Sequence, residues 1–185
     1  GELSVGSFGR KRADLSYGVA TDQWHAYVGA GLFDENGWRD FSDGKLGTLV
    51  GKVGRSTDVG DFSLNLLAGR STLVGNGLVP LYTFDDDGAR TPDLGAKRRQ
   101  AVYTHPDETR NRLTQVSVTW NHALTPQVSA EALIYARRTR RTTINGDEAD
   151  DADTPPLPGD PNASFNRTAT RQSGAGAAFA LSGKH

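Results

Sequence analysis

The chain has 185 residues, a formal net charge of −1, and neither cysteine nor methionine. This charge gives no electrostatic basis for a nucleic-acid partner. The absence of cysteine excludes a disulfide framework, a thiolate metal site and a cysteine nucleophile. No stretch approaches the roughly 18 consecutive apolar residues of a transmembrane helix. The mean hydropathy of −0.54 describes a chain that is polar on average. Transmembrane barrels are also polar on average, because their strands alternate lipid-facing and water-facing residues.

Alternation of apolar and polar residues, the pattern of a strand with two different faces, recurs along the whole chain. Val116, Val118 and Trp120, for example, alternate with polar residues. No helix is predicted, and the fourth of the predicted strands has apolar residues on both faces. In chain order, strands are predicted at Leu3–Val5, Arg12–Val19, Trp24–Leu32, Leu46–Val53, Phe62–Gly69, Gln115–Asn121, Val128–Ala136 and Gly174–Leu181.

The predicted connections alternate in length. After a short first connection around Gly6–Gly9, short ones are expected at Ala20–Gln23, Thr57–Asp61 and Thr125–Gln127, and long ones at Asp34–Gly44, Asn76–Glu108 and Asn145–Asn166. Outer-membrane barrels have short periplasmic turns and longer extracellular loops. We therefore predict an all-β fold: an antiparallel, up-and-down transmembrane β-barrel segment of about eight strands.

Aromatic residues on the apolar parity lie beside the short turns or near the end of the last strand. Amphipathic rings gather at the membrane–water boundary of barrels, although aromatic residues are also common in strands generally. We predict a membrane-interface girdle of Tyr17, Trp24, Phe62, Trp120 and Phe179.

Several stretches resemble the plug-to-barrel junction and first barrel strands of TonB-dependent receptors. The junction is carried by GELSVGSFGRKRADLSYG and WHAYVGAGLFDENGWRD, with the turn Gly6-Ser7-Phe8-Gly9 and the pair Gly37-Trp38. Two further stretches of this chain resemble early barrel hairpins of the same family. They are SLNLLAGRSTLVGNGLVP and THPDETRNRLTQVSVTWNHALTPQVSAEALIYARRTRRTTINGD.

This resemblance implies an outer-membrane barrel of about 22 strands, filled by an N-terminal plug. The complete protein would actively take up a scarce large solute, namely a ferric siderophore, cobalamin or an oligosaccharide, driven by the TonB complex through the plug. Residues 1–185 would be a partial barrel domain, truncated at both ends, because no plug precedes Gly1 and residues 182–185 lack a terminal aromatic strand. The inward parity, with Arg12, Asp14 and Glu131, is too polar for the dry interior of a closed small barrel and suits a wall facing a plug.

No enzyme, resident cofactor or metal site is predicted. The four histidines, His25, His105, His122 and His185, are far apart in sequence, and no spacing suggests a Ser–His hydrolase. The acidic runs Asp85–Gly88 and Asp147–Asp153 are expected to be solvated loop tips; the alternative is a calcium site, although neither run fits the EF-hand pattern.

Two regions are candidates for binding. Arg137, Arg138, Arg140 and Arg141 lie at the outer end of their strand, where guanidinium groups could contact the phosphates of lipopolysaccharide in addition to ordinary outer-membrane lipid. The connection Asn76–Glu108 is the main candidate for capture of the extracellular solute, since aromatic and Arg side chains anchor recognition surfaces; the alternative is an ordinary surface loop. Its candidate residues are Tyr82, Phe84, Arg98, Arg99, Tyr103 and His105, with Lys97 beside them.

Two other functions fit parts of the pattern. A passive outer-membrane porin would share the barrel wall but would have no plug upstream. A soluble all-β ligand-binding module would bury its apolar faces against each other, although the alternation of short and long connections argues against it.

Overall fold

The computed structural model describes residues 1–75, 100, 102, 105–148 and 163–183. These residues form an all-β structure with one short 3₁₀ turn, η1 (Ser7–Gly9). All eight predicted strands are present. They are β1 (Glu2–Val5), β2 (Lys11–Ala20), β3 (Trp24–Glu35), β4 (Gly44–Thr57), β5 (Gly60–Val74), β6 (Glu108–Ala123), β7 (Val128–Glu148) and β8 (Ala163–Gly183).

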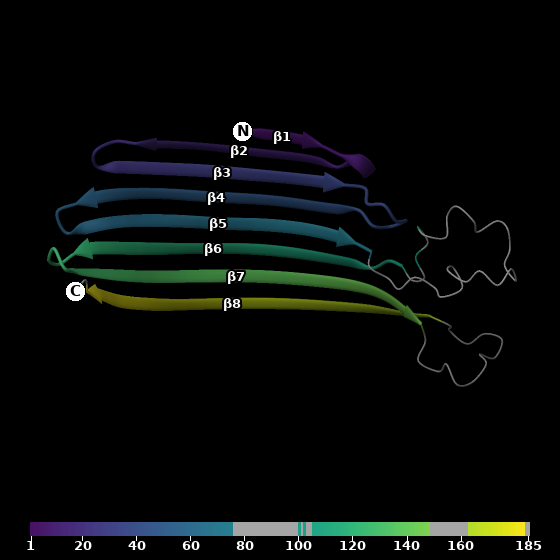
Figure 1. The fold of residues 1–185 in the computed structure, drawn as a ribbon. Coiled ribbons are helices and arrows are strands. Elements are labelled where there is room, and N and C mark those ends of the chain that lie inside the picture. The colour runs from purple at the N-terminus through teal and green to yellow at the C-terminus, as the bar shows by residue number, and fades with distance from the viewer. Residues whose placement is uncertain (76–99, 101, 103–104, 149–162, 184–185) are drawn as a thin grey trace, which may run out of the picture.

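The strands form one open antiparallel sheet in the order β1-β2-β3-β4-β5-β6-β7-β8. Each strand pairs with the next one in the chain, so β1 and β8 are the two edges of the sheet (Figure 1). The short connections β2–β3, β4–β5 and β6–β7 share one end, which we call the turn end. The connections β3–β4, β5–β6 and β7–β8 share the other, which we call the loop end. The predicted up-and-down fold is thereby confirmed.

The strands are longer at the loop end than the alternation predicts. The connection predicted at Asn145–Asn166 is wrong at both ends, since β7 continues to Glu148 and β8 begins at Ala163. The β-branched run Thr142–Ile144 favours an extended chain, and it pairs with Arg167–Ala169. Strand β6 likewise begins at Glu108, well before the predicted Gln115. Its first residues, Glu108–Arg112, are polar on both faces and therefore show no alternation with a period of two.

The short connection predicted around Gly6–Gly9 is confirmed, and its residues Ser7–Gly9 form the 3₁₀ turn η1. It holds Phe8 at φ 59° and Gly9 at φ 70°, in the left-handed region that glycine adopts readily. The Gly6 amide donates to the Arg10 carbonyl oxygen at 2.9 Å. The chain therefore reverses within a few residues, from β1 into β2.

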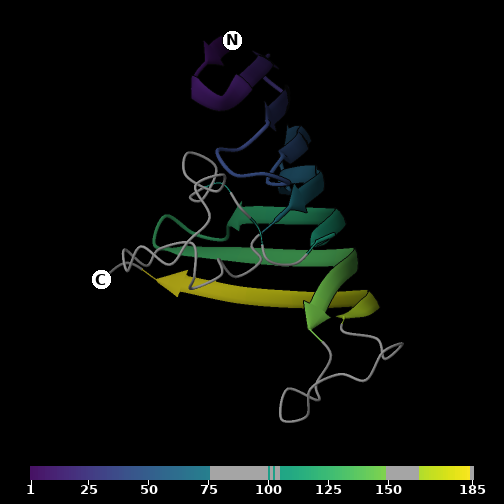
Figure 2. The same cartoon turned by 90° about the vertical axis from the view of Figure 1, so that its right-hand side faces the viewer.

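The register brings the apolar residues of successive strands to one face of the sheet. Leu64 lies opposite Val118, which lies opposite Ile134. The other face carries their polar neighbours, for example Asn65 opposite Ser117. Throughout most of β6, residues of the polar face are half-buried and those of the apolar face are exposed. Because the sheet curves (Figure 2), this difference identifies the polar face as the concave one.

The described residues contain almost no hydrophobic core. Ala130, at 1% exposure, is the only buried hydrophobic residue among them, whereas Tyr17, Ile134 and Phe179 are 71%, 64% and 65% exposed. No second layer covers the apolar face within the described part of the chain, and contiguous apolar surface on this scale indicates contact with lipid or with another protein surface. The described residues include no helix long and apolar enough to span a membrane.

Candidate functional site

Four predicted girdle residues lie in a single row across the sheet. Trp24 pairs with Arg55, Arg55 with Phe62, and Phe62 with Trp120. The row continues through Ala132, which pairs with Trp120 and, on its other side, with Phe179. We call the four aromatic residues of this row, Trp24, Phe62, Trp120 and Phe179, the aromatic row. It lies at the turn end of the apolar face.

Polar groups accompany the rings of the aromatic row. The Trp120 indole N–H donates to the Val59 carbonyl oxygen at 2.8 Å, and the Arg55 guanidinium lies 5.1 Å from the centre of the Trp24 ring. Rings that are apolar on one side and hydrogen-bonded on the other suit a membrane interface.

Tyr17 lies outside the aromatic row. It pairs with Val28, four residues along β3 from Trp24, so its ring lies within the apolar face and not at its margin. The membrane-interface role of the five aromatic residues stays a prediction.

Of the residues predicted for solute capture, only His105 lies within the described residues. Tyr82, Phe84, Arg98, Arg99 and Tyr103 lie outside them, as does Lys97. The His105 ring stacks on Phe41, with ring centroids 4.2 Å apart and an interplanar angle of 25°.

Phe41 belongs to the connection between β3 and β4 and was not predicted as a site residue. The fold of that connection positions it: Gly37 has φ 75° and Phe41 has φ 51°, and the Ser42 hydroxyl donates to the Arg39 carbonyl oxygen at 2.7 Å. Phe41 remains 55% exposed. The one sequence signal for it is an aromatic residue in a predicted loop, where no alternating strand partners account for it.

Backbone hydrogen bonds join the bases of the connections at the loop end. The Gly75 amide donates to the Asp107 carbonyl oxygen at 2.7 Å, and the Asp40 amide donates to the Gln100 carbonyl oxygen at 2.9 Å. The Gly146 amide lies 3.0 Å from the Asp107 carboxylate. The Phe41–His105 stack is therefore held by segments of two connections, β3–β4 and β5–β6, and by the loop end of β7, and together these form one rim.

The concave face below this rim carries paired charges and tyrosines. The Arg12 guanidinium contacts the Asp14 carboxylate at 2.5 Å. At the rim, the hydrogen bond from Arg10 to Glu35, at 3.0 Å, raises the pKa of Arg10. Farther down the wall, Tyr135 covers Gly176, where a Cβ atom would lie only 2.7 Å from the tyrosine ring.

The remaining polar candidates do not form a reactive cluster. His25 Nε2 lies 3.4 Å from Ser63 Oγ, and no third orienting group contacts this pair among the described residues. His122 stacks near Trp120, with ring centroids 5.9 Å apart. The described residues contain no group of three or more His, Asp or Glu side chains that could hold a metal. The acidic runs lie outside them except for Asp147 and Glu148 at the end of β7.

The four arginines predicted to contact lipopolysaccharide do not share a face. Arg137 and Arg141 belong to the concave polar face, opposite Gln115 and Asn111. Arg138 and Arg140 belong to the apolar face. Only two of the four can therefore meet lipid in a barrel whose apolar face is outermost.

The sheet matches part of a solved import-receptor structure. The open form of the ferric-catecholate import receptor Fiu from E. coli K12 superposes with a TM-score of 0.71 at 15% sequence identity, over 98% of this chain and 30% of that chain. The closed form of the same receptor gives a TM-score of 0.64 at 16% identity, over 92% of this chain and 26% of that chain. The chain has the fold of a receptor-barrel segment.

This match confirms the fold that the resemblance to TonB-dependent receptors predicts. The chain spans less than a third of the receptor's own length. No family model and no curated protein sequence matches it.

Proposed function

We propose that this chain is part of the barrel wall of an outer-membrane receptor that actively imports a scarce large solute. One observation carries the proposal: the register places most apolar residues of β2–β8 on the convex face and most polar residues on the concave face. Such a wall fits lipid on one side and a wet, plug-filled lumen on the other. The match to an import receptor over 98% of the chain supports the same role.

The solute meets the protein at the loop-end rim in this proposal. Exposed aromatic rings such as Phe41 and Trp38, with Arg39 beside Trp38, are the kind of side chain that anchors binding surfaces. A ferric siderophore is the favoured solute class, because the matching receptor imports a ferric catecholate; cobalamin and oligosaccharides are the other two classes. Energy would come from the TonB complex, acting on a plug domain of the complete protein. We propose no catalytic role and no cofactor.

Fractionation and energised uptake test this proposal. The intact protein should sediment with the outer membrane after lysis without detergent, and cells that carry it should accumulate a radiolabelled ferric siderophore, cobalamin or oligosaccharide. Dissipating the proton-motive force should abolish the uptake. A protein that stays in the soluble fraction would contradict the membrane assignment, and uptake that survives dissipation would indicate a passive channel instead.

A further inference from the structure

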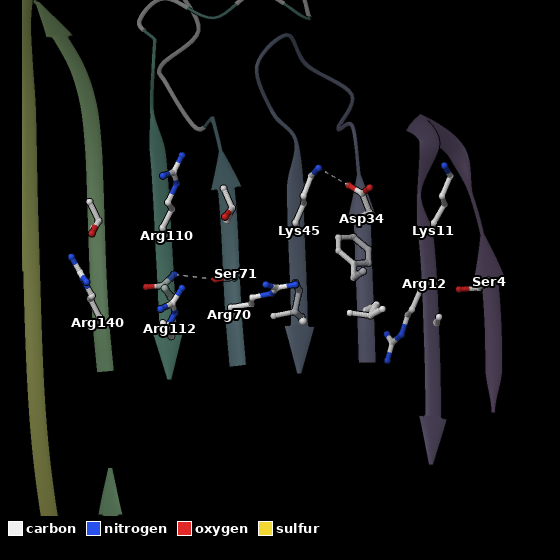
Figure 3. A pocket seen from close by; sticks show the side chains of 18 of the residues that line it. Ser4, Lys11, Arg12, Asp34, Lys45, Arg70, Ser71, Arg110, Arg112 and Arg140 are labelled. Atoms are coloured by element: carbon white, nitrogen blue, oxygen red, sulfur yellow. Dashed lines mark hydrogen bonds and ion pairs between the residues drawn. The ribbon is translucent and has the colours of Figure 1, made fainter. Parts of the chain in front are cut away.

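Four arginines from four successive strands stand directly opposite one another. Arg70 of β5 pairs with Arg112 of β6, Arg112 with Arg140 of β7, and Arg140 with Arg171 of β8. We call these four residues the arginine row. Figure 3 shows Arg70, Arg112 and Arg140 at one level on their three strands.

The arginine row belongs to the apolar face. Arg70 and Arg112 each lie an even number of residues from Leu66 and Val116, which pair with each other on that face. Arg70 also lies along β4, because its Nε atom would be 3.5 Å from a Cβ atom at Gly47 and the Leu32 side chain 3.6 Å from the same point. Arg138, two residues before Arg140, lies on the same face at the next level.

Among the described residues, no carboxylate compensates the charge of these arginines. All four of the row and Arg138 are exposed, and none forms an ion pair with a carboxylate among the described residues. Other cations of the same face do have partners: Arg110 contacts Glu108, and Lys45 lies 3.9 Å from Asp34. Like charges directly opposite each other destabilise a sheet. A bound anion would therefore stabilise the arginine row.

The position of the row indicates where that anion comes from. Arg70 lies eight residues from Phe62, and Arg112 lies eight residues from Trp120, which is about 27 Å along a strand. For strands tilted by about 40°, this length corresponds to about 20 Å along the membrane normal. That distance is close to the height of the apolar band in outer-membrane barrels, about 25 Å. The aromatic row and the arginine row therefore bound the apolar face at opposite margins, and the arginines lie at the loop end.

A shallow groove provides room at this margin. It has a volume of about 920 Å³ and runs across the loop ends of β1 to β8, lined mainly by apolar-face residues that include Arg70, Arg110, Arg112 and Arg140. Because most of its lining residues belong to the apolar face, a lipid headgroup beside that face would meet these arginines.

We propose that the arginine row, together with Arg138, binds the phosphate groups of the phosphorylated lipid of the outer leaflet, lipopolysaccharide. Planar guanidinium groups hold phosphate oxygens bidentately, and adjacent strands about 4.8 Å apart allow one phosphate to bridge two arginines. The inference rests on the proposed membrane location of the chain. It retains Arg138 and Arg140 from the sequence prediction, excludes Arg137 and Arg141, and adds Arg70, Arg112 and Arg171.

The test compares two double variants of the intact protein purified in detergent. Arg138→Gln with Arg140→Gln removes two charges from the convex face, and the control, Arg137→Gln with Arg141→Gln, removes two from the concave face of the same strand. The probe is fluorescent bis-phosphorylated lipid A, measured beside the same lipid without phosphates and in competition with inorganic phosphate. We expect the first pair to weaken binding of the phosphorylated lipid at least about tenfold and the control pair to leave it within about twofold.

Three results would overturn the inference. They are equal loss in both pairs, equal binding of the dephosphorylated lipid to the unsubstituted protein, and displacement of the lipid by millimolar inorganic phosphate, which would indicate a free-anion site. If the Gln pair does not fold, Arg112→Lys with Arg140→Lys keeps the charge and removes the bidentate geometry. Weakened binding by that pair supports the inference, and unchanged binding overturns it. A protein that fractionates with the outer membrane without phosphate-dependent binding contradicts this inference alone; a soluble protein contradicts the proposed function as well.

Discussion

An arginine placed at the centre of the apolar face should destabilise the barrel far more than one placed on the adjacent residue. Val116 lies four residues from Trp120 and four from Arg112, midway between the two margins, and its paired neighbours are Leu66 and Ala136. A cation at the bilayer midplane costs roughly 2–4 kcal/mol on the lipid-facing side of a barrel. At about 1.4 kcal/mol for each factor of ten, Val116→Arg should lower the folding equilibrium constant by at least about 30-fold.

Ser117→Arg is the matched control. Ser117 is the next residue of the same strand, on the concave face between Asn65 and Tyr135, so its arginine would reach the wet side. The assay is urea unfolding of the intact protein in phospholipid vesicles, followed by its heat-modifiable mobility on gels. Equal destabilisation by Val116→Arg and Ser117→Arg would refute the assignment of the two faces.

Three further changes test the concave wall and the rim. Gly176→Ala should lower the free energy of unfolding by about 1–3 kcal/mol because the added Cβ atom displaces the Tyr135 ring. The control, Gly174→Ala, should change that free energy little, since a Cβ atom there meets nothing within 4 Å. Similar urea midpoints for the two variants would contradict the tyrosine packing. Phe41→Ala should remove the stack with His105, worth about 0.5–1.5 kcal/mol, and weaken solute binding up to about tenfold on whole cells; unchanged affinity would remove Phe41 from the site. Replacing Asp85–Lys97 by a short Gly-Ser linker should preserve assembly and weaken solute binding about tenfold or more, and unaltered affinity at equal surface copy number would make that connection a bystander.

The sequence predicts the strands well where one face is apolar and the other polar. Val116, Val118 and Trp120 alternate with small polar residues, so both the strand and its facing can be read from the period of two. The same interpretation fails toward the loop end, where Glu108–Arg112 is polar on both faces. At that end, the outward-facing residues lie beyond the apolar band of the sheet. The strand therefore has no alternation of apolar and polar residues by which it could be predicted.

Cross-strand neighbours were harder to predict than the strands. A short turn fixes register, as between β4 and β5, where Thr57 pairs with Gly60. Strands β5 and β6 are instead joined by a long connection, so the sequence does not predict that Arg70 lies opposite Arg112. The arginine row therefore emerged only from the sheet, while the predicted cluster of adjacent arginines divides between two faces. The Phe41–His105 stack was missed for the same reason, since its two rings come from different connections.

Lipid accessibility along β6 tests most directly whether the apolar face meets the membrane. These 185 residues contain no cysteine. In an intact protein otherwise free of cysteine, a thiol introduced at each position from Thr114 to Trp120 in turn can carry a fluorescent label after insertion into the membrane. Quenching by brominated lipid should alternate with a period of two, strong at Val116 and Val118 and weak at Ser117 and Thr119, with the opposite order for a water-soluble quencher. Uniform quenching along the strand, or strong lipid quenching at Ser117 and Thr119, would contradict a barrel wall with its apolar face in lipid.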